Sequence, residues 1–416
     1  PPRSTLFPYT TLFRSVSLFL GMIVSAEEII KDQKIIERES FLNLSRFSYL
    51  NSKIVFLFGL SAIQMFMYVL IANYILEIQG MTLSYWFILF SGSCFANLIG
   101  LTISSTLSSV VAVYIAIPFV LVPQILLSGT VVQFDNLHPS LTKREYTPFV
   151  GDLMVSRWVY EALAVEQFKN NKYEKYFYPF EKQKSDATYK ASFLIPKIEQ
   201  KLDLCLKAIE NDTLTEKQIR DFYYLENGVK DLAFSTEMGP FEYIQKLNPS
   251  KFSEEVYEET YDYLQFMKMN FNQKTQIAES KIDSVVTALE GIYGKDFLFH
   301  LRAGFYNKSL ADYVLNRWEL NKIYEGNNKL VRKKDPVFMS PESGFGRAHF
   351  YAPSKIFLKQ KYDTFWFNIT IVWIMSLVLY FFLLFDILKK LLEQLNFGFN
   401  LLRKILFGLS ANISKK

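Results

Sequence analysis

The hydropathy pattern divides the chain into long apolar stretches and one long polar stretch. Residues 54–76 carry no charged side chain, residues 78–134 contain no Asp, Glu, Lys or Arg, and residues 364–385 form a last apolar run. About 20 apolar residues cross a bilayer, and Gly80 and the polar run 104–109 mark turns inside the longest stretch. The pattern therefore predicts three membrane-spanning helices within residues 54–131 and a last one within residues 364–388.

The first residues of the chain do not fit this pattern. Residues 1–15, PPRSTLFPYTTLFRS, contain a near-repeat and lack the positively charged start of a signal peptide. They resemble translated sequencing-adapter sequence, and we exclude them from the expected fold. Residues 16–26 form an apolar run about half as long as a span requires. We expect this run to be the end of a truncated membrane helix, and the chain to be a C-terminal fragment.

The polar stretch, residues 132–363, is expected to form one large helical domain. Residues 195–209, 253–271 and 273–293 carry apolar residues at helical spacing. Between positions 135 and 363 there are 33 basic and 33 acidic residues, so the net charge of +5 arises elsewhere. The predicted fold class is mainly α: a polytopic transmembrane helical bundle with a large helical insertion before the last span.

Lysine and arginine in the short flanking segments predict the orientation of the spans. Residues 27–53 and the basic amphipathic tail, residues 389–416, are rich in both and belong on the cytoplasmic side. Alternation of the spans then places residues 132–363 outside the cytoplasm. We expect a multi-pass integral protein of a bacterial inner membrane, with its large domain on the outer side.

The segment that follows residue 26 combines an apolar stripe with dense charge. Its isoleucines recur at a spacing compatible with one face of a helix, and charged side chains cover the rest. Such a helix either lies at the membrane interface and contacts another protein or is a solvated loop helix without a partner. The candidate contact residues are Glu28, Lys31, Arg38 and Glu39.

Two segments resemble one known family. Arg38 and Glu39 precede a linker and a Ser-Tyr-Leu-x-x-Lys sequence that contains Tyr49 and Lys53. Further along the chain, IPFVLVPQILLSGTVVQFDNL is followed by SRWVYEALAVEQF, residues 156–168. Together these segments resemble the coupling region and the re-entrant element of type-2 ATP-binding cassette exporters, especially the G subfamily. An insertion of more than 190 residues, at positions 170–362, departs from the eukaryotic members, and the family does not supply its function.

The resemblance implies roles for particular residues. Residues 27–53 would be a cytoplasmic coupling segment, and the external domain would begin with a re-entrant element. The residues matched to that element are Arg157, Tyr160, Glu161 and Phe168. Uncharged polar residues and helix-breaking prolines in the spans are candidates for a substrate cavity: Gln64, Asn97, Pro118 and Gln124.

The resemblance also implies partners and cofactors. The chain would be the membrane-spanning half of an ATP-driven exporter and would pair with a second half, as a homodimer, in membrane lipid. ATP and Mg would be bound by a nucleotide-binding domain absent from this chain, and transport ATPase activity would exist only together with that domain. The alternative is a membrane-anchored scaffold or sensor whose external helical domain binds a partner protein. Co-purification of an ATPase domain would distinguish the two.

Small residues repeat at every fourth position of one predicted span, at Gly92, Ala96 and Gly100. Such a stripe lets helices approach closely in a membrane. We expect this stripe to pack against other helices of the same bundle, in preference to forming a contact between two copies of the chain.

Motifs of catalysis and metal binding are missing from the sequence. There is no G-x-x-x-x-G-K-[ST] loop, no H-E-x-x-H and no Cys/His cluster with metal-ligand spacing. No catalytic residue and no metal ligand is predicted, and the membrane anchor argues against nucleic-acid binding.

Overall fold

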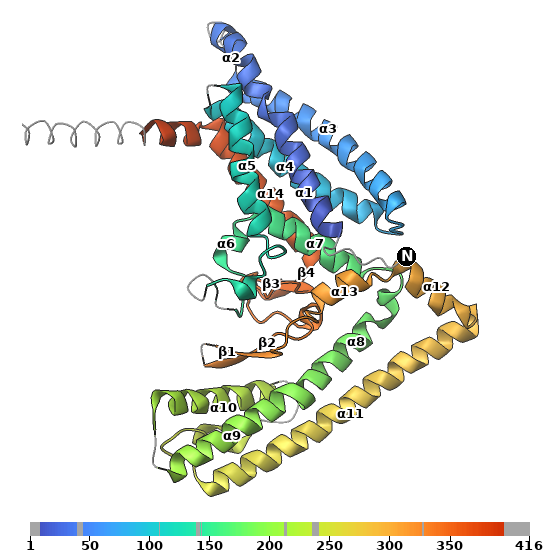
Figure 1. Ribbon diagram of the computed structural model, residues 1–416, viewed down its shortest axis with the longest axis vertical. Coiled ribbons are helices and arrows are strands. Elements are labelled where there is room, and N and C mark those ends of the chain that lie inside the picture. Colours follow the sequence, from blue (N-terminus) through green and yellow to red (C-terminus); the bar gives the residue numbers. More distant parts are fainter. Residues whose placement is uncertain are drawn as a thin grey trace, which may run out of the picture.

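A computed structural model describes residues 9–39, 45–107, 109–138, 142, 144–211, 214–234, 241–326 and 328–394. The chain is mainly helical, which confirms the predicted fold class at that level. Figure 1 shows three regions along the long axis: a helical bundle, a middle region with short helices and two hairpins, and an outlying layer of long helices.

The bundle contains five helices near the start of the chain and one near its end (Figure 1). They are α1 (Tyr9–Ala26), α2 (Glu28–Glu39), α3 (Arg46–Ile75), α4 (Thr82–Thr106), α5 (Val110–Leu126) and α14 (Thr364–Leu384). In the described part of the chain, α3, α4 and α14 are long and apolar enough to cross a membrane, while α5 is apolar but has 17 residues. Three helices rather than the four predicted therefore reach full spanning length.

Helix α4 lies at the centre of the bundle. Of its most apolar window, 83% is buried, against 28% in α3 and in α14. The outward faces of α3, α5 and α14 expose large apolar side chains, among them Val55, Phe119 and Leu377. A helix that is buried all round is a core helix, and an apolar face without a protein partner fits contact with lipid.

Helix α1 begins earlier than the sequence indicated. Its first helical residue is Tyr9, within the stretch that sequence analysis excluded. Phe13 is buried and makes edge contacts with Tyr68 and Tyr85, with ring centroids 5.5 and 5.7 Å apart. The expected boundary at residue 16 is therefore wrong for the helix, because apolar packing on α3 and α4 continues beyond it.

Two antiparallel hairpins and several short helices form the middle region. Sequence analysis predicted no strands here, and each strand has only four residues, so no alternating pattern was long enough to detect. The elements are α6 (Phe149–Asp152), α7 (Val155–Lys169), α13 (Lys308–Val314), β1 (Ile323–Gly326), β2 (Lys329–Arg332), β3 (Ser354–Phe357) and β4 (Gln360–Asp363). Short 3-10 segments lie in this region at Phe134–Asn136 and Pro336–Phe338, and another, Glu242–Lys246, packs in the outlying layer.

The outlying layer is helical, as predicted, but its longest helix is continuous. The elements are α8 (Glu174–Tyr189), a π-helical turn at Lys190–Leu194, α9 (Ile195–Glu210), α10 (Glu216–Phe234), α11 (Glu254–Tyr293) and α12 (Asp296–Phe305). The two helices predicted at residues 253–271 and 273–293 are one helix of 40 residues, because the exposed polar Asn272 does not interrupt it. Ser253 caps its start, and Gly294 follows its end with a φ of 89°.

The two ends of the bundle make different contacts. At one end, Arg46 at the start of α3 pairs with Asp386 just after α14, and Tyr114 near the start of α5 donates to Glu27 between α1 and α2. At the other end, α7 packs against α4 and α14, next to the middle region (Figure 1). The start of α3, the start of α5 and the end of α14 thus lie at the same end of the bundle. Spans that alternate in direction, as predicted, require this arrangement.

Candidate functional site

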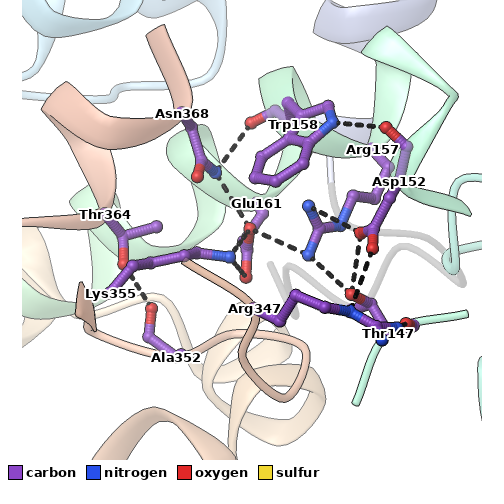
Figure 2. A network of polar contacts seen from close by, with 10 residues as sticks. All are labelled: Thr147, Asp152, Arg157, Trp158, Glu161, Arg347, Ala352, Lys355, Thr364 and Asn368. Atoms are coloured by element: carbon purple, nitrogen blue, oxygen red, sulfur yellow. Dashed lines mark hydrogen bonds and ion pairs between the residues drawn. The ribbon is translucent and has the colours of Figure 1, made fainter. Parts of the chain in front are cut away.

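A buried ion pair joins α7 to the hairpin that precedes the last helix of the bundle. The side chains of Glu161 and Lys355 are both completely buried, and Lys355 Nζ donates to Glu161 Oε1 at 3.1 Å and to Oε2 at 2.8 Å. Figure 2 shows the pair at the centre of a polar network. Burying a carboxylate or an ammonium alone is costly, so each of these groups depends on the other.

Three further side chains complete the network. Asn368 on α14 donates to Glu161 Oε2 at 2.9 Å and to the Trp158 carbonyl at 3.1 Å. Arg157 lies 3.6 Å from the same carboxylate oxygen and 3.3 Å from Asp152 Oδ1 (Figure 2). The network therefore links α7 to β3 and α14, which lie about 190 residues or more further along the chain.

The two side chains oppose the effect of burial on each other. Burial lowers the pKa of Lys355 to about 8, and the neighbouring Glu161 carboxylate opposes that shift. Burial raises the pKa of Glu161, but the cations of Arg157 and Lys355 outweigh it, so its net shift is downward. Each partner thus favours the charged form of the other.

The four residues assigned to the re-entrant element by resemblance are all buried in α7. The structure brings Arg157 and Glu161 together in the network. It places the other two in an apolar cluster with α13: the Tyr160 hydroxyl accepts a hydrogen bond from Tyr351 at 3.3 Å, and the Phe168 ring makes an edge contact with Phe338.

Sequence analysis missed three members of the network: Asp152, Lys355 and Asn368. Lys355 carried no signal, because a single lysine in a charged stretch resembles any exposed lysine. Asn368 did carry one: it is a polar side chain within an otherwise apolar run, and such residues are usually hydrogen-bonded inside a bundle.

A second polar cluster lies at the opposite end of the bundle, where α2 meets α3. Lys53 Nζ lies 2.8 Å from Glu28 Oε2 and 2.8 Å from Asp32 Oδ2, and the Tyr49 hydroxyl donates to the same Asp32 oxygen at 3.1 Å. Tyr49 and Lys53 are the residues that carried the family resemblance in this segment. Their contacts fasten α2 along the first turns of α3.

The start of α2 is also fastened to α4. The first N–H groups of a helix lack intrahelical acceptors, and here Ser104 Oγ near the end of α4 accepts from Ile29 N at 3.2 Å and from Ile30 N at 3.0 Å. Ser104 therefore caps the start of α2 from a different helix. It also links α2 directly to the central helix of the bundle.

The four candidate contact residues of α2 have different environments. Glu28 pairs with Lys53, and Lys31 pairs with Glu27, the residue just before α2, while remaining exposed. Arg38 is exposed near the end of α2. Glu39 is the last residue of α2, and its side chain lies outside the described part.

The candidate cavity residues are not brought together. Asn97 is buried and donates to Ser61 Oγ at 2.7 Å, between α4 and α3. Gln124 is buried at the end of α5, where its side-chain oxygen accepts from the Ser156 N–H at 3.2 Å. Pro118 is exposed on α5 and Gln64 is half-buried on α3. The hydrogen bonds of Asn97 and Gln124 thus join neighbouring elements. A cavity of about 90 Å³ lies elsewhere, in the middle region, and its lining includes Thr130, Arg144 and His349 but none of the four candidate residues.

The stripe of small residues faces other helices of the same chain. A Cβ added at Gly92 would lie 3.1 Å from Val159 Cγ2 on α7, and one added at Gly100 would lie 2.8 Å from the Met22 carbonyl on α1. Gly21 of α1 packs equally closely on Ala96. Close backbone approach of this kind gives helix association in lipid, where apolar burial supplies little net drive.

Comparison with known proteins concerns the first part of the chain. Residues 6–168, which run from α1 to the end of α7, match the family of the ABC-2 type transporter membrane domain. No curated protein and no solved structure with which the chain was compared gave a match. The match and the apolar helices together suggest an integral membrane protein whose first part, residues 6–168, is similar to an ABC-2 type transporter membrane domain.

Proposed function

We propose that this chain is the membrane-spanning half of an ATP-driven exporter resembling the G subfamily, and that it works as a pair with a second copy. One observation carries the proposal: the residues that match the ABC-2 transporter family coincide with helices α1 to α7, including the charged helix α2 at one end of the bundle. In this assignment α2 is the coupling helix and faces the cytoplasm. ATP and Mg are bound by a nucleotide-binding domain that is either fused to this chain or a separate subunit.

The contacts of α2 fit a coupling role. Lys53 links it to α3 and Ser104 links it to α4, so a displacement of α2 acts on two spans at once. Its exposed charged residues, including Lys31 and Arg38, remain available for a partner protein. A solvated loop helix would need none of the tertiary contacts that hold its buried side.

The opposite end of the bundle fits a re-entrant element that moves together with the last span. Glu161 on α7 is held by Lys355 and by Asn368 of α14, so α7 and α14 are joined by charged and polar contacts that are expensive to separate. A change in the tilt of α14 would therefore displace α7. This gives the proposed exporter an external gate linked to its membrane helices.

The test uses the full protein with its ATPase domain, reconstituted in liposomes. ATP hydrolysis is compared for the unaltered protein, for Lys53→Glu, and for the charge-restoring variant Lys53→Glu with Glu28→Lys and Asp32→Asn. Arg38→Glu with Glu39→Lys tests the exposed side of the helix, and Lys281→Glu on the exposed surface of α11 is the control.

We expect Lys53→Glu and the Arg38/Glu39 reversal to abolish the stimulation of hydrolysis by the membrane domain, the charge-restoring variant to recover part of it, and Lys281→Glu to leave it unchanged. Unaltered stimulation in both α2 variants would refute the coupling assignment. A full protein that co-purifies with no ATPase domain would instead support the membrane-anchored scaffold.

A further inference from the structure

The β3–β4 hairpin is rigidly attached to the start of α14. β4 ends at Asp363, whose side chain accepts from the Phe365 N–H at 3.1 Å and so caps α14 directly, with no linker between strand and helix. Thr364 Oγ1 donates to the Ala352 carbonyl at 2.5 Å, and Lys355 is held by Glu161. The hairpin therefore cannot swing independently of the last span.

One face of the hairpin is buried against α7 near the base of the hairpin and exposed near the tip of the hairpin. Directly opposed residues of antiparallel strands share a face, as do alternate residues of one strand. Lys355 opposes Tyr362, and Phe357 opposes Phe345 in an added bridge. All four side chains therefore lie on one face, but Lys355 is buried against α7 whereas the three aromatic side chains are exposed by 40% or more.

The residues at the tip are also unusual for a turn exposed to water. Leu358 and Lys359 both have positive φ, at 50° and 65°, a conformation that favours Asn and Gly. The Leu358 side chain is nevertheless 73% exposed. Lys359 and Lys361 beside it are exposed as well, so the tip combines apolar, aromatic and cationic groups.

The exposed tip of the hairpin lies close to the start of α14, the helix proposed to enter the membrane. The tip lies six residues before the start of α14, which limits its distance from that helix end to about 20 Å at 3.3 Å per residue. Trp366, in the first turn of α14, is 61% exposed and extends the apolar surface onto the outward face of the helix. Figure 1 places the hairpin beside the end of the bundle from which α14 starts.

We propose that Phe345, Phe357, Leu358 and Tyr362 form a docking surface for the lipid bilayer, seated in the headgroup region where α14 enters the membrane. Aromatic side chains favour this region, and lysines beside them can reach lipid phosphates while their methylene chains remain apolar. Docking there fixes the height of the hairpin, and through Lys355 it fixes the height of Glu161 and α7. The inference shares with the proposed function the premise that α14 spans the membrane.

The test measures contact with lipid at single labelled positions in the full-length protein. Cysteine variants Leu358→Cys, Leu377→Cys and Lys281→Cys carry a small fluorophore, and the protein is held in phosphatidylcholine nanodiscs with or without brominated lipid. Leu377 is exposed on the middle of α14 and reports whether that helix spans the bilayer, while Lys281 on α11 reports contact with water. The native Cys94 and Cys205 are buried, and labelling of the unsubstituted chain measures their background.

We expect brominated lipid to quench the label at positions 358 and 377 but not at 281. A second sample, labelled at 358 and carrying Phe345→Ser and Phe357→Ser, is expected to lose most of the quenching at 358. Quenching at 377 without quenching at 358 would overturn the docking surface alone. If the unlabelled Leu358→Cys variant forms a disulfide between two copies when an added oxidant is supplied, the surface belongs to a protein contact instead. Absence of quenching at 377 would overturn both this inference and the spanning role of α14.

Discussion

Glu161 Oε2 accepts hydrogen bonds from Lys355 Nζ at 2.8 Å and from Asn368 Nδ2 at 2.9 Å, and both donors lie about 200 residues further along the chain. The acceptor belongs to the segment that matches the transporter family, while both donors lie outside the matched residues. The unmatched part of the chain is thus bonded into the matched part at a buried position. The hairpin that carries Lys355 is therefore joined to α7 by a direct charged contact.

The network predicts an unequal response to removal of its charges. Glu161→Gln leaves the cations of Lys355 and Arg157 without their shared carboxylate, and we expect a loss of about 3–5 kcal/mol in the free energy of unfolding. Lys355→Met leaves Glu161 with Arg157 3.6 Å away, so the loss is expected to be smaller. Thermal unfolding of the purified protein in detergent measures both, with exposed Lys359→Met as a control expected within about 0.5 kcal/mol of the unaltered protein. Equal losses for the two variants would contradict the shared-carboxylate arrangement.

Apolar periodicity predicted the helical bundle because spanning length and charge-free composition are local properties. The segment of α7 was identified by the family resemblance of Tyr160, Glu161 and Phe168 and not by periodicity. The partners of Glu161 could not be predicted in the same way, because Lys355 and Asn368 meet it only through the tertiary fold. The hydrogen bonds of Asn97 and Gln124, which join neighbouring helices, could not be predicted for the same reason, and the role of these residues in a substrate cavity stays a prediction.

A buried carboxyl group predicts a pH dependence of stability. Both side-chain oxygens of Glu174 are buried without a hydrogen-bond donor, and burial, reinforced by the neighbouring Glu181, raises the pKa of Glu174 to about 9. Between pH 4.5 and pH 9 the folded protein holds a proton that the unfolded chain releases. Stability therefore falls as pH rises through this window, by at most about 1.4 kcal/mol per pH unit.

Glu174→Gln replaces the ionisable group by a neutral side chain of the same shape. We expect this variant to lose the dependence and to unfold at a higher temperature than the unaltered protein at pH 8, as measured by thermal unfolding at pH 5, 7 and 8. Glu258→Gln, at an exposed position on α11, is the matched control. Parallel pH curves for Glu174→Gln and the unaltered protein would show that Glu174 does not titrate as inferred.

The seam between α1 and α4 predicts a graded response to added methyl groups. A Cβ at Gly100 would overlap Ser25 Oγ and approach the Met22 carbonyl, whereas a Cβ at Gly92 would meet the Val159 side chain at 3.1 Å. We expect Gly100→Ala to cost about 2–3 kcal/mol and Gly92→Ala about 1 kcal/mol, because backbone yields less than a side chain. Gly59→Ala, with no atom within 4 Å, is expected to be neutral or to stabilise by about 0.5 kcal/mol. Unfolding temperatures of the three variants measure the order, and a reversed order would be incompatible with this seam.

The cap that α4 provides for α2 predicts a local effect on backbone exchange. Ser104→Ala removes the acceptor of the Ile29 and Ile30 N–H groups, and loss of a comparable cap costs about 1 kcal/mol. Hydrogen exchange followed by mass spectrometry is expected to show faster exchange at the start of α2. Ser105→Ala is the control, because the Ser105 hydroxyl donates only to the Thr102 carbonyl of its own helix. Identical exchange in the two variants would mean that Ser104 does not hold α2.

A buried guanidinium near the start of α1 predicts a stabilising substitution. Arg14 is completely buried and donates to Ser128 at 2.6 Å and to Thr130 at 3.1 Å, but its Nε and Nη2 groups have no hydrogen-bond acceptor and no carboxylate of the described residues pairs with it. An unpaired buried charge opposes folding, so Arg14→Leu is expected to raise the free energy of unfolding by about 1 kcal/mol despite the loss of two hydrogen bonds. Arg157→Leu is the matched comparison: its guanidinium faces Asp152, and its removal is expected to lower the unfolding temperature. A lower unfolding temperature for Arg14→Leu would show that the buried guanidinium stabilises this end of α1.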